Sequence, residues 1–182
     1  MDIEFVPFPK IARLNREVVI TEKIDGTNAQ VWVSEDCQTV RAGSRTRWIT
    51  PEDDNFGFAK WVAEHEAELR GLGPGAHFGE WWGAGIQRRY GLTEKRFSLF
   101  NVHRWSDGSE TPRPACCHVV PVLARGIGIE TLGTDALNRL RTDGSVAAPG
   151  FDKPEGIVIF HAASSQLFKI TLEKDEAPKG KS

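Results

Sequence analysis

Short, mostly apolar runs rich in β-branched and aromatic residues, separated by polar stretches, recur along much of the chain and predict β-strands. The first two runs, Val18–Ile20 and Ala29–Val33, enclose Asp25-Gly26, so we expect a hairpin of two strands joined by a tight turn. Pro121 puts its strand at a sheet edge, because proline cannot donate a ladder hydrogen bond. The segment 39–49 is expected to form a short strand that leads into a polar loop. The other expected strands are 96–105 and 118–123, with a second hairpin at 155–161 and 166–172.

Helical periodicity is limited to two segments. In the longer one, 50–70, Thr50 is the expected N-cap, Pro51 suits the first turn, and glycines between 71 and 75 end the helix. The shorter one, 134–143, ends at Gly144. Because strands dominate and helices are few, we expect an α+β fold of antiparallel sheets flanked by helices. The apolar face of the longer helix consists of Phe58, Trp61, Val62 and Leu69, with His65 beside them in the core.

Length and composition suit a single cytoplasmic domain. The chain has 182 residues, of which 40% are hydrophobic and 26% charged, ordinary values for a globular protein with its own core. No run approaches the ~20 apolar residues of a membrane span, and the N-terminus lacks the pattern of a signal peptide. Three cysteines, two of them adjacent, indicate a reducing compartment rather than a disulfide framework. We expect one domain at 1–173, a frayed tail at 174–182 and no C-terminal accessory domain.

The net charge of −2 excludes a protein that simply coats nucleic acid, since such proteins are basic overall. Contact with nucleic acid would therefore need a local patch. Arg88, Arg89 and Arg96, with Tyr90, form either a phosphate-binding stripe or a solvated face. Cys116-Cys117-His118 lacks the spacing of a zinc site. Trp81 and Trp82 suit either the core or the wall of a nucleotide site.

Four charged or aromatic clusters interrupt the pattern of strands. Lys23 stands between two predicted strands, next to Asp25-Gly26, and a glycine there lets a ligand or another backbone approach closely. The other clusters are 78–91, 154–160 and 167–171. A lone lysine beside a turn is usually a solvated surface residue. Because three further charged or aromatic clusters accompany Lys23 in this chain, the pattern indicates a functional site.

These clusters resemble the motifs of the covalent nucleotidyltransferase superfamily, the polynucleotide ligases and mRNA capping enzymes. Four elements occur in the order of that superfamily: Lys23-Ile24-Asp25-Gly26 as K-x-D-G, Phe78-Gly79-Glu80, Glu155-Gly156-Ile157-Val158, and Leu167-Phe168-Lys169-Ile170. The segments "EKIDGTN" (22–28) and "GEWWGAGIQRRYG" (79–91) are most similar to RNA ligases of the phage T4 RNA ligase 2 type. "GSRT" (43–46) and "FSLFNV" (97–102) complete a resemblance that spans residues 18–171.

The resemblance implies an ATP-dependent RNA ligase with a nucleotidyltransferase (ATP-grasp-like) adenylylation domain. Such enzymes transfer AMP from ATP to a lysine and then to a 5′-phosphate, and finally join that end to a 3′-hydroxyl. The implied cofactors are ATP and Mg²⁺ or Mn²⁺, and the implied partner is RNA or a nicked duplex in RNA repair. An accessory protein or domain could act in trans.

By the same resemblance, Lys23 is the nucleophile, Lys169 binds the α-phosphate, and Glu155 serves the divalent metal. Glu80 would bind the ribose hydroxyls. Phe100 would stack on the adenine rather than Phe97, because strand alternation gives the two rings opposite faces. The other residues expected at the nucleotide are Glu22, Ile24, Asp25, Gly26, Asn28 and Arg45, with Asp25 and Gly26 shaping the loop.

The chain departs from the family pattern in its last motif, usually K-x-K, where Thr171 holds the second lysine position and Lys174 is a possible substitute. Three alternatives stay open. A small ATP-dependent DNA ligase would share the motifs. A capping guanylyltransferase would need a further C-terminal domain. A non-catalytic nucleotide- or RNA-binding relic would keep the fold without ever forming an adduct on Lys23.

Overall fold

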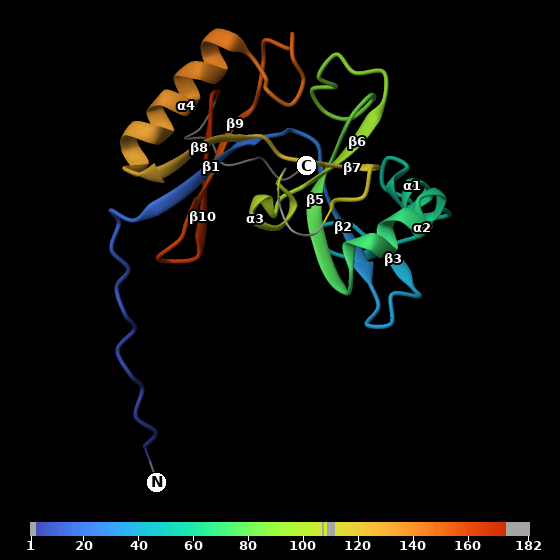
Figure 1. Ribbon diagram of the computed structural model, residues 1–182, viewed down its shortest axis with the longest axis horizontal. Helices are drawn as coiled ribbons and strands as arrows, with labels where there is room; N and C mark the ends of the chain where they lie inside the picture. Colours follow the sequence, from blue (N-terminus) through green and yellow to red (C-terminus); the bar gives the residue numbers. More distant parts are fainter. Residues whose placement is uncertain (1–2, 107, 109–111, 174–182) are drawn as a thin grey trace.

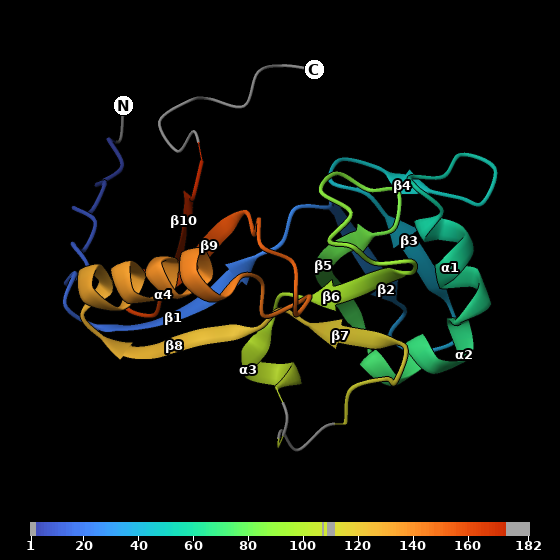
Figure 2. The same cartoon turned by 90° about the horizontal axis from the view of Figure 1, so that it is seen from above.

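Two β-sheets and their helices make up the computed structural model, which describes residues 3–106, 108 and 112–173. Figure 1 shows the sheets next to each other, and Figure 2 shows α4 over the four-stranded sheet, α1 and α2 at the far side of the six-stranded sheet, and α3 between the two. The four-stranded sheet has the order β10-β9-β1-β8 and the six-stranded sheet the order β4-β3-β2-β5-β6-β7. Within the described residues every strand pair is antiparallel except β6 with β7. The predicted α+β class with antiparallel sheets is confirmed.

The four-stranded sheet packs one face against a single long helix. The alternation in β1 sends Val18 and Ile20 to that face, where they meet Leu140 of the helix in one apolar cluster. The opposite face of this sheet carries Lys23. The elements are β1 (Glu17–Lys23), β8 (Val122–Ile127), α4 (Ile129–Asp143), β9 (Gly156–His161) and β10 (Gln166–Thr171).

The six-stranded sheet packs one face against short helices. Val31, Trp81 and Phe97 from three strands pack with Phe58 and Leu69 from the helices. The strands are β2 (Thr27–Val33), β3 (Val40–Gly43), β4 (Trp48–Ile49), β5 (Gly75–Gly83), β6 (Lys95–Leu99) and β7 (Cys117–Val119). The helices are α1 (Phe58–Glu64), α2 (Glu66–Leu69), the 3-10 turn Arg70–Leu72 and α3 (Val102–Trp105).

The expected hairpin at residues 18–33 is wrong. Its two strands form where predicted, but β1 pairs with β8 and β9 while β2 pairs with β3 and β5. The segment 24–26 therefore crosses from one sheet to the other. The side chain of Ile24 is buried in a third apolar cluster with Trp82 and Tyr90, which fixes this crossing.

Two helix boundaries also differ from expectation. Thr50 does not cap a helix, since α1 starts only at Phe58, after Phe56 and Gly57 adopt positive φ angles of 53° and 80°. The Asp54 carboxylate accepts hydrogen bonds from the first free amides of α1 instead. Residues 102–105, expected as a strand, form α3, which the Asn101 side chain caps. The shorter predicted helix begins earlier, at Ile129, and ends at Gly144 as expected.

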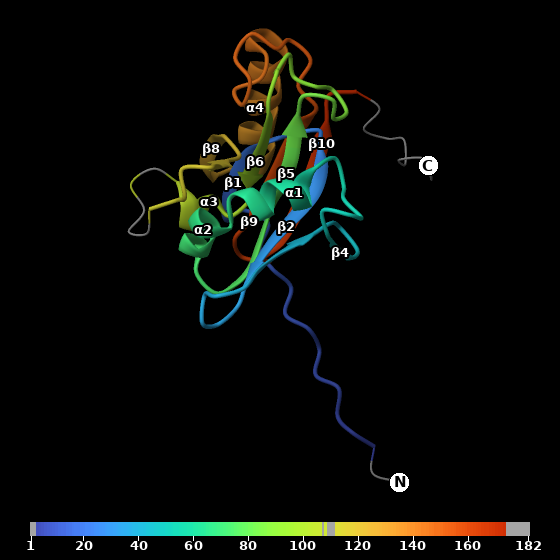
Figure 3. The ribbon, with the colours of Figure 1, turned by 90° about the vertical axis from the view of Figure 1, so that its right-hand side faces the viewer.

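The N-terminal residues 3–14 leave the body of the molecule as an extended arm (Figure 3). The arm joins the four-stranded sheet at Leu14, whose carbonyl contacts Nε2 of the buried His161 at 2.8 Å. Within the described residues, no helix has the length and apolar composition needed to span a membrane.

Leu140 offers a direct test of the packing between α4 and the four-stranded sheet. It is fully buried against β1 and β9, so Leu140→Ala should lower the free energy of unfolding by about 2–5 kcal/mol. Urea denaturation measures this change. The neighbouring exposed Asn138→Ala should shift stability by no more than about 0.5 kcal/mol; equal effects for both variants would contradict the described packing.

Candidate functional site

Lys23 is the last residue of β1, where the chain is about to leave the four-stranded sheet. Its amine lies 2.5 Å from Oε2 of Glu155, and the two side chains are 17% and 5% exposed. A buried carboxylate is costly unless it is paired, so this contact holds both groups at the sheet end. The two residues are 132 positions apart in sequence. The structure thus brings together the first and third of the motifs recognised in the sequence.

The packing of the sheet requires a glycine at position 156, directly after Glu155. This glycine pairs with Lys23 on one side and Thr171 on the other, in the row of residues at the end of the sheet. A Cβ at this position would lie 2.1 Å from the carbonyl oxygen of Ile170, and φ is +156°. Only glycine lets β10 approach so closely. The close approach sets Glu155 beside the end of β1.

Glu80 reaches the crossing segment from the other sheet. Its Oε1 accepts a hydrogen bond of 3.0 Å from the backbone amide of Gly26. A Cβ on Gly26 would lie 2.4 Å from the carbonyl oxygen of Trp81 and 2.7 Å from Cβ of Trp82. The glycine therefore lets the segment after Lys23 lie directly on β5. The K-x-D-G and Gly-Glu motifs meet through this contact.

Burial raises the pKa of the Glu80 carboxyl to about 7. The positive charge of Lys23 and the Gly26 amide oppose this shift, while the negative charges of Glu155 and Asp25 add to it. Near neutral pH, Glu80 therefore exists in both protonation states. It can donate or accept a hydrogen bond on the side of the loop that carries Lys23.

Arg88 and Tyr90 both hold Asp25. The sequence had suggested that they belong to a phosphate-binding stripe or to a solvated face. Arg88 donates from Nε to Oδ2 of Asp25 at 3.1 Å and from NH1 to the carbonyl of Lys153 at 3.0 Å. The backbone amide of Asp25 donates to the Tyr90 hydroxyl at 2.8 Å. Burial raises the pKa of that hydroxyl, so it stays neutral. Arg88 thereby ties the loop that follows Lys23 to the segment that precedes Glu155.

Glu22 does not join this cluster with its side chain. Alternation along β1 turns it to the face opposite Lys23, where its carboxylate accepts from the Ser145 hydroxyl and from the amides of Val146 and Ala147. Burial raises its pKa, and these hydrogen bonds limit the rise. Glu22 thus anchors the loop after α4, a role that the neighbouring motif concealed. The Ile24 side chain is likewise turned into the core.

The remaining predicted site residues lie on the open faces of the two sheets. Lys169 is opposite Val158 on β9, two places along the sheet from the row that contains Lys23. Asn28 is opposite Glu80. Phe100 is 41% exposed just after β6, whereas Phe97 is fully buried in the core, as the alternation predicted. Arg45 is exposed in the turn between β3 and β4. Lys174 lies outside the described residues.

The open questions about other residues have clear answers. Trp81 and Trp82 are 2% and 1% exposed, so both belong to the core. His65 is only half-buried and stacks on Trp61 at a centroid distance of 4.8 Å. The predicted arginine stripe is not a row of free cations, since Arg88 pairs with Asp25 and Arg96 with Glu94.

The side chains near Lys23 could hold a divalent cation only if water molecules and a bound phosphate supplied most of its ligands. No three His, Cys, Asp or Glu side chains among the described residues are grouped as a metal cage. Mg²⁺ commonly binds through one or two carboxylates plus phosphate oxygens and waters. Glu155, beside the Lys23 amine, supplies such a carboxylate.

A lysine amine at the crossing between two sheets, paired with the buried Glu155 and close enough to the buried Glu80 to affect its pKa, forms the centre of the candidate site. The RNA ligase family model matches residues 16–171. The chain therefore belongs to the RNA ligase family. A search among curated proteins finds no match.

Solved structures of an RNA ligase from Naegleria gruberi share the fold. A variant with AMP and Mn superposes with a TM-score of 0.59 and 19% identity over 87% of this chain and 50% of that chain. Another variant, with ATP and Mn, gives 0.62 and 18% over 88% and 51%. The structure with PPi gives 0.58 and 20% over 86% and 50%. The chain thus spans about half the length of these ligases.

The raised pKa of Glu80 predicts a pH dependence of stability. Between the usual pKa of 4.5 and about 7 the folded protein keeps a proton that the unfolded chain has lost, so folding stability falls as pH rises through this window. Glu80→Gln removes this dependence. Relative to the parent, the variant should gain about 2–3 kcal/mol between pH 4.5 and pH 8 in urea denaturation. Exposed Glu64→Gln controls for the lost charge; a stability difference between the parent and Glu80→Gln that stays constant with pH would refute the assignment.

The contact between Gly26 and β5 predicts that a single methyl group disturbs the crossing. Gly26→Ala should lower stability by about 1–3 kcal/mol, because its Cβ overlaps the backbone of Trp81. Thermal unfolding measures the loss. Gly71→Ala is the control, since the nearest atom to its Cβ is 3.7 Å away. Similar stability of both variants would show that the crossing lies elsewhere.

Proposed function

We propose that the chain is an ATP-dependent RNA ligase of the T4 RNA ligase 2 type, with Lys23 as the residue that carries AMP. The observation that supports this most directly is the Lys23 amine held 2.5 Å from Glu155 at the crossing between the sheets. Membership of the RNA ligase family supports the reaction class. The domain would then be the adenylylation domain of the covalent nucleotidyltransferase superfamily.

In the first step, the Lys23 amine attacks the α-phosphorus of ATP. A P–N bond forms, the bond from that phosphorus to the bridging oxygen breaks, and pyrophosphate leaves with the electron pair. The amine loses its proton, for which the adjacent Glu155 carboxylate is the nearest acceptor. Phosphoryl transfer depends mainly on positioning and electrostatics. The rigid end of the sheet would therefore promote the reaction by holding Lys23 in a fixed position.

The other side chains bind the nucleotide around Lys23. Glu80, whose pKa near 7 lets it donate or accept, would hold the ribose hydroxyls. Lys169, on the same sheet face as Lys23, would bind the α-phosphate. Phe100 offers an exposed ring for the adenine. Asn28 and Arg45 would contact the sugar and phosphates from the open side of the second sheet.

Glu155 would hold the Mg²⁺ or Mn²⁺ ion, whose charge would make the Lys23 ammonium less favourable and stabilise the developing charge on the phosphate. In the resting pair Glu155 neutralises the amine's positive charge. The Glu155 carboxylate would therefore both position the Lys23 amine and accept its proton. Asp25 would shape the loop rather than bind the metal, and its ion pair with Arg88 supports this role.

The later steps use RNA. An oxygen of the RNA 5′-phosphate attacks the phosphorus of lysyl-AMP and the P–N bond breaks, which returns the amine to Lys23. A 3′-hydroxyl then attacks the activated 5′-phosphate, a phosphodiester forms, and AMP leaves. We place this activity in cytoplasmic RNA repair, on RNA ends or nicked duplexes, with a second protein or domain able to act in trans.

Lys23→Ala tests the proposal. The variant should form no radiolabelled adduct with [α-³²P]ATP and a divalent cation, and should not seal a nicked RNA duplex, because no other side chain can replace the amine. Lys153→Ala is the control, since Lys153 is an exposed neighbour that contributes only its carbonyl to the site. Thermal unfolding should show that both variants remain folded.

The outcome decides between the candidate functions. Undiminished labelling of Lys23→Ala would overturn the assignment of the nucleophile. Absence of labelling in the parent protein would favour a nucleotide- or RNA-binding relic. Sealing of nicked DNA but not of nicked RNA would replace the RNA ligase with a DNA ligase.

A further inference from the structure

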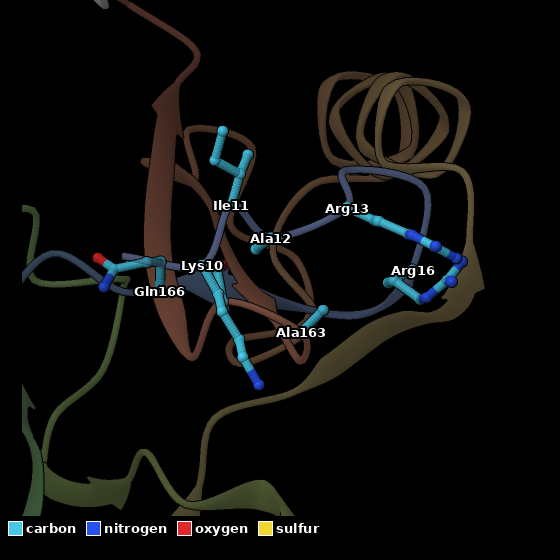
Figure 4. Close-up of a pocket in the computed structure, with 8 residues that line it drawn as sticks. Lys10, Ile11, Ala12, Arg13, Arg16, Ala163 and Gln166 are labelled. Carbon is cyan, nitrogen blue, oxygen red and sulfur yellow. The ribbon is translucent and has the colours of Figure 1, made fainter. Parts of the chain in front are cut away.

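A groove lies at the base of the N-terminal arm, at the end of the four-stranded sheet opposite Lys23. Its volume is about 440 Å³, and the arm forms one wall while the turn between β9 and β10 forms the other (Figure 4). Six steps along β1 separate Glu17 from Lys23, which corresponds to about 20 Å. That separation is too large for the triphosphate of an ATP bound at Lys23. The residues that line the groove are Lys10, Ile11, Ala12, Arg13, Arg16, Ala163, Ser164 and Gln166.

Three of these side chains are cations, in a chain with a net charge of −2. In Figure 4, Arg13 and Arg16 extend toward one another and Lys10 points into open space on the other side of the groove. Within the described residues none of the three belongs to an ion pair, and the Arg16 guanidinium donates only to the carbonyl of Asn15. Like charges that face each other without a carboxylate are unfavourable until an anion joins them.

The arm also exposes two aromatic rings, which precede these cations in the sequence. Phe5 and Phe8 are 86% and 83% exposed, which is unusual for side chains of this size. Exposed aromatic rings next to clustered cations are the combination that binds single-stranded nucleic acid, since bases stack on rings while cations meet phosphates. Gln166 adds a side-chain amide that can donate to a phosphate oxygen.

We propose that the arm and this groove bind a single-stranded segment of the RNA substrate, with phosphates on Lys10, Arg13 and Arg16 and bases on Phe5 and Phe8. The proposal rests on the RNA ligase function proposed above and adds a contact remote from the nucleophile. The buried His161 supports it structurally, because its ring holds the arm at Leu14 and contacts Ser164 of the opposite wall. Groove and arm are thereby fixed to the same sheet that carries Lys23.

The test compares two triple variants of equal net charge. One is Lys10→Ala/Arg13→Ala/Arg16→Ala, and the matched control is Arg70→Ala/Arg139→Ala/Arg141→Ala, which removes exposed cations of α4 and the 3-10 turn. Fluorescence anisotropy measures binding of a labelled single-stranded 5′-phosphorylated RNA at several salt concentrations. The arm variant should bind roughly 10- to 100-fold more weakly at low salt, and the slope of log affinity against log salt should fall by about 2. Phe5→Ala/Phe8→Ala should weaken binding with little change in that slope.

A second measurement, the yield of the AMP adduct, shows whether the arm cations bind the phosphates of RNA or those of ATP. It also separates a failure of this proposal from a failure of the ligase function. In the absence of RNA, the yield of the adduct formed from ATP and a divalent cation should be equal in the parent, the arm variant and the control. Reduced adduct yield in the arm variant alone would mean that the cations serve the nucleotide, and would overturn the RNA site. Equal RNA binding by both triple variants would also overturn it, and would leave the exposed arm for a protein partner. Failure of the parent to form any adduct would instead refute the ligase function, while the affinity difference would still report on the arm.

Discussion

The crossing of the chain between two sheets at residues 24–26 is the constraint on which the candidate site depends. Gly26 can lie on β5 only because it has no side chain, and its amide is then within 3.0 Å of Glu80. The same crossing leaves Lys23 at the last position of a rigid strand, where Glu155 meets its amine. A lysine on a free loop would have to lose conformational freedom each time it binds a ligand. Here that loss has already occurred on folding.

Charge is distributed so that each group of the site has a defined partner. Arg88 neutralises Asp25 and links the loop that carries it to Lys153, while the Tyr90 hydroxyl accepts from the Asp25 amide. Glu22, one residue before Lys23, binds the loop after α4 on the opposite face of the sheet. Lys23 pairs with Glu155, and Glu80 accepts from the Gly26 amide. The burial that raises the pKa of Glu80 to about 7 is what makes its protonation adjustable at physiological pH.

Local patterns predicted the positions of most strands well, because β-branched and aromatic runs are local properties of the sequence. The strands around Lys23, the C-terminal hairpin and the end of α4 at Gly144 all form as expected. The sheet partners could not be predicted, since Asp-Gly between two β-rich runs is equally suited to a hairpin and to a crossing. Glu22 was misjudged for a similar reason: the motif made it look like a ligand residue, and only the three-dimensional position of Ser145 shows its role. The functional roles of Asn28, Arg45, Phe100 and Lys169 stay predictions, supported by their place on the open faces.

Location of the covalent nucleotide on the wild-type protein tests the central claim most directly. Purified protein would be incubated with ATP and Mg²⁺ or Mn²⁺, its intact mass determined, and its proteolytic peptides sequenced by mass spectrometry. The account predicts a gain of one AMP on the peptide that contains Lys23, bound through the side-chain nitrogen. AMP on another residue, or an unmodified protein with both metals, would contradict it.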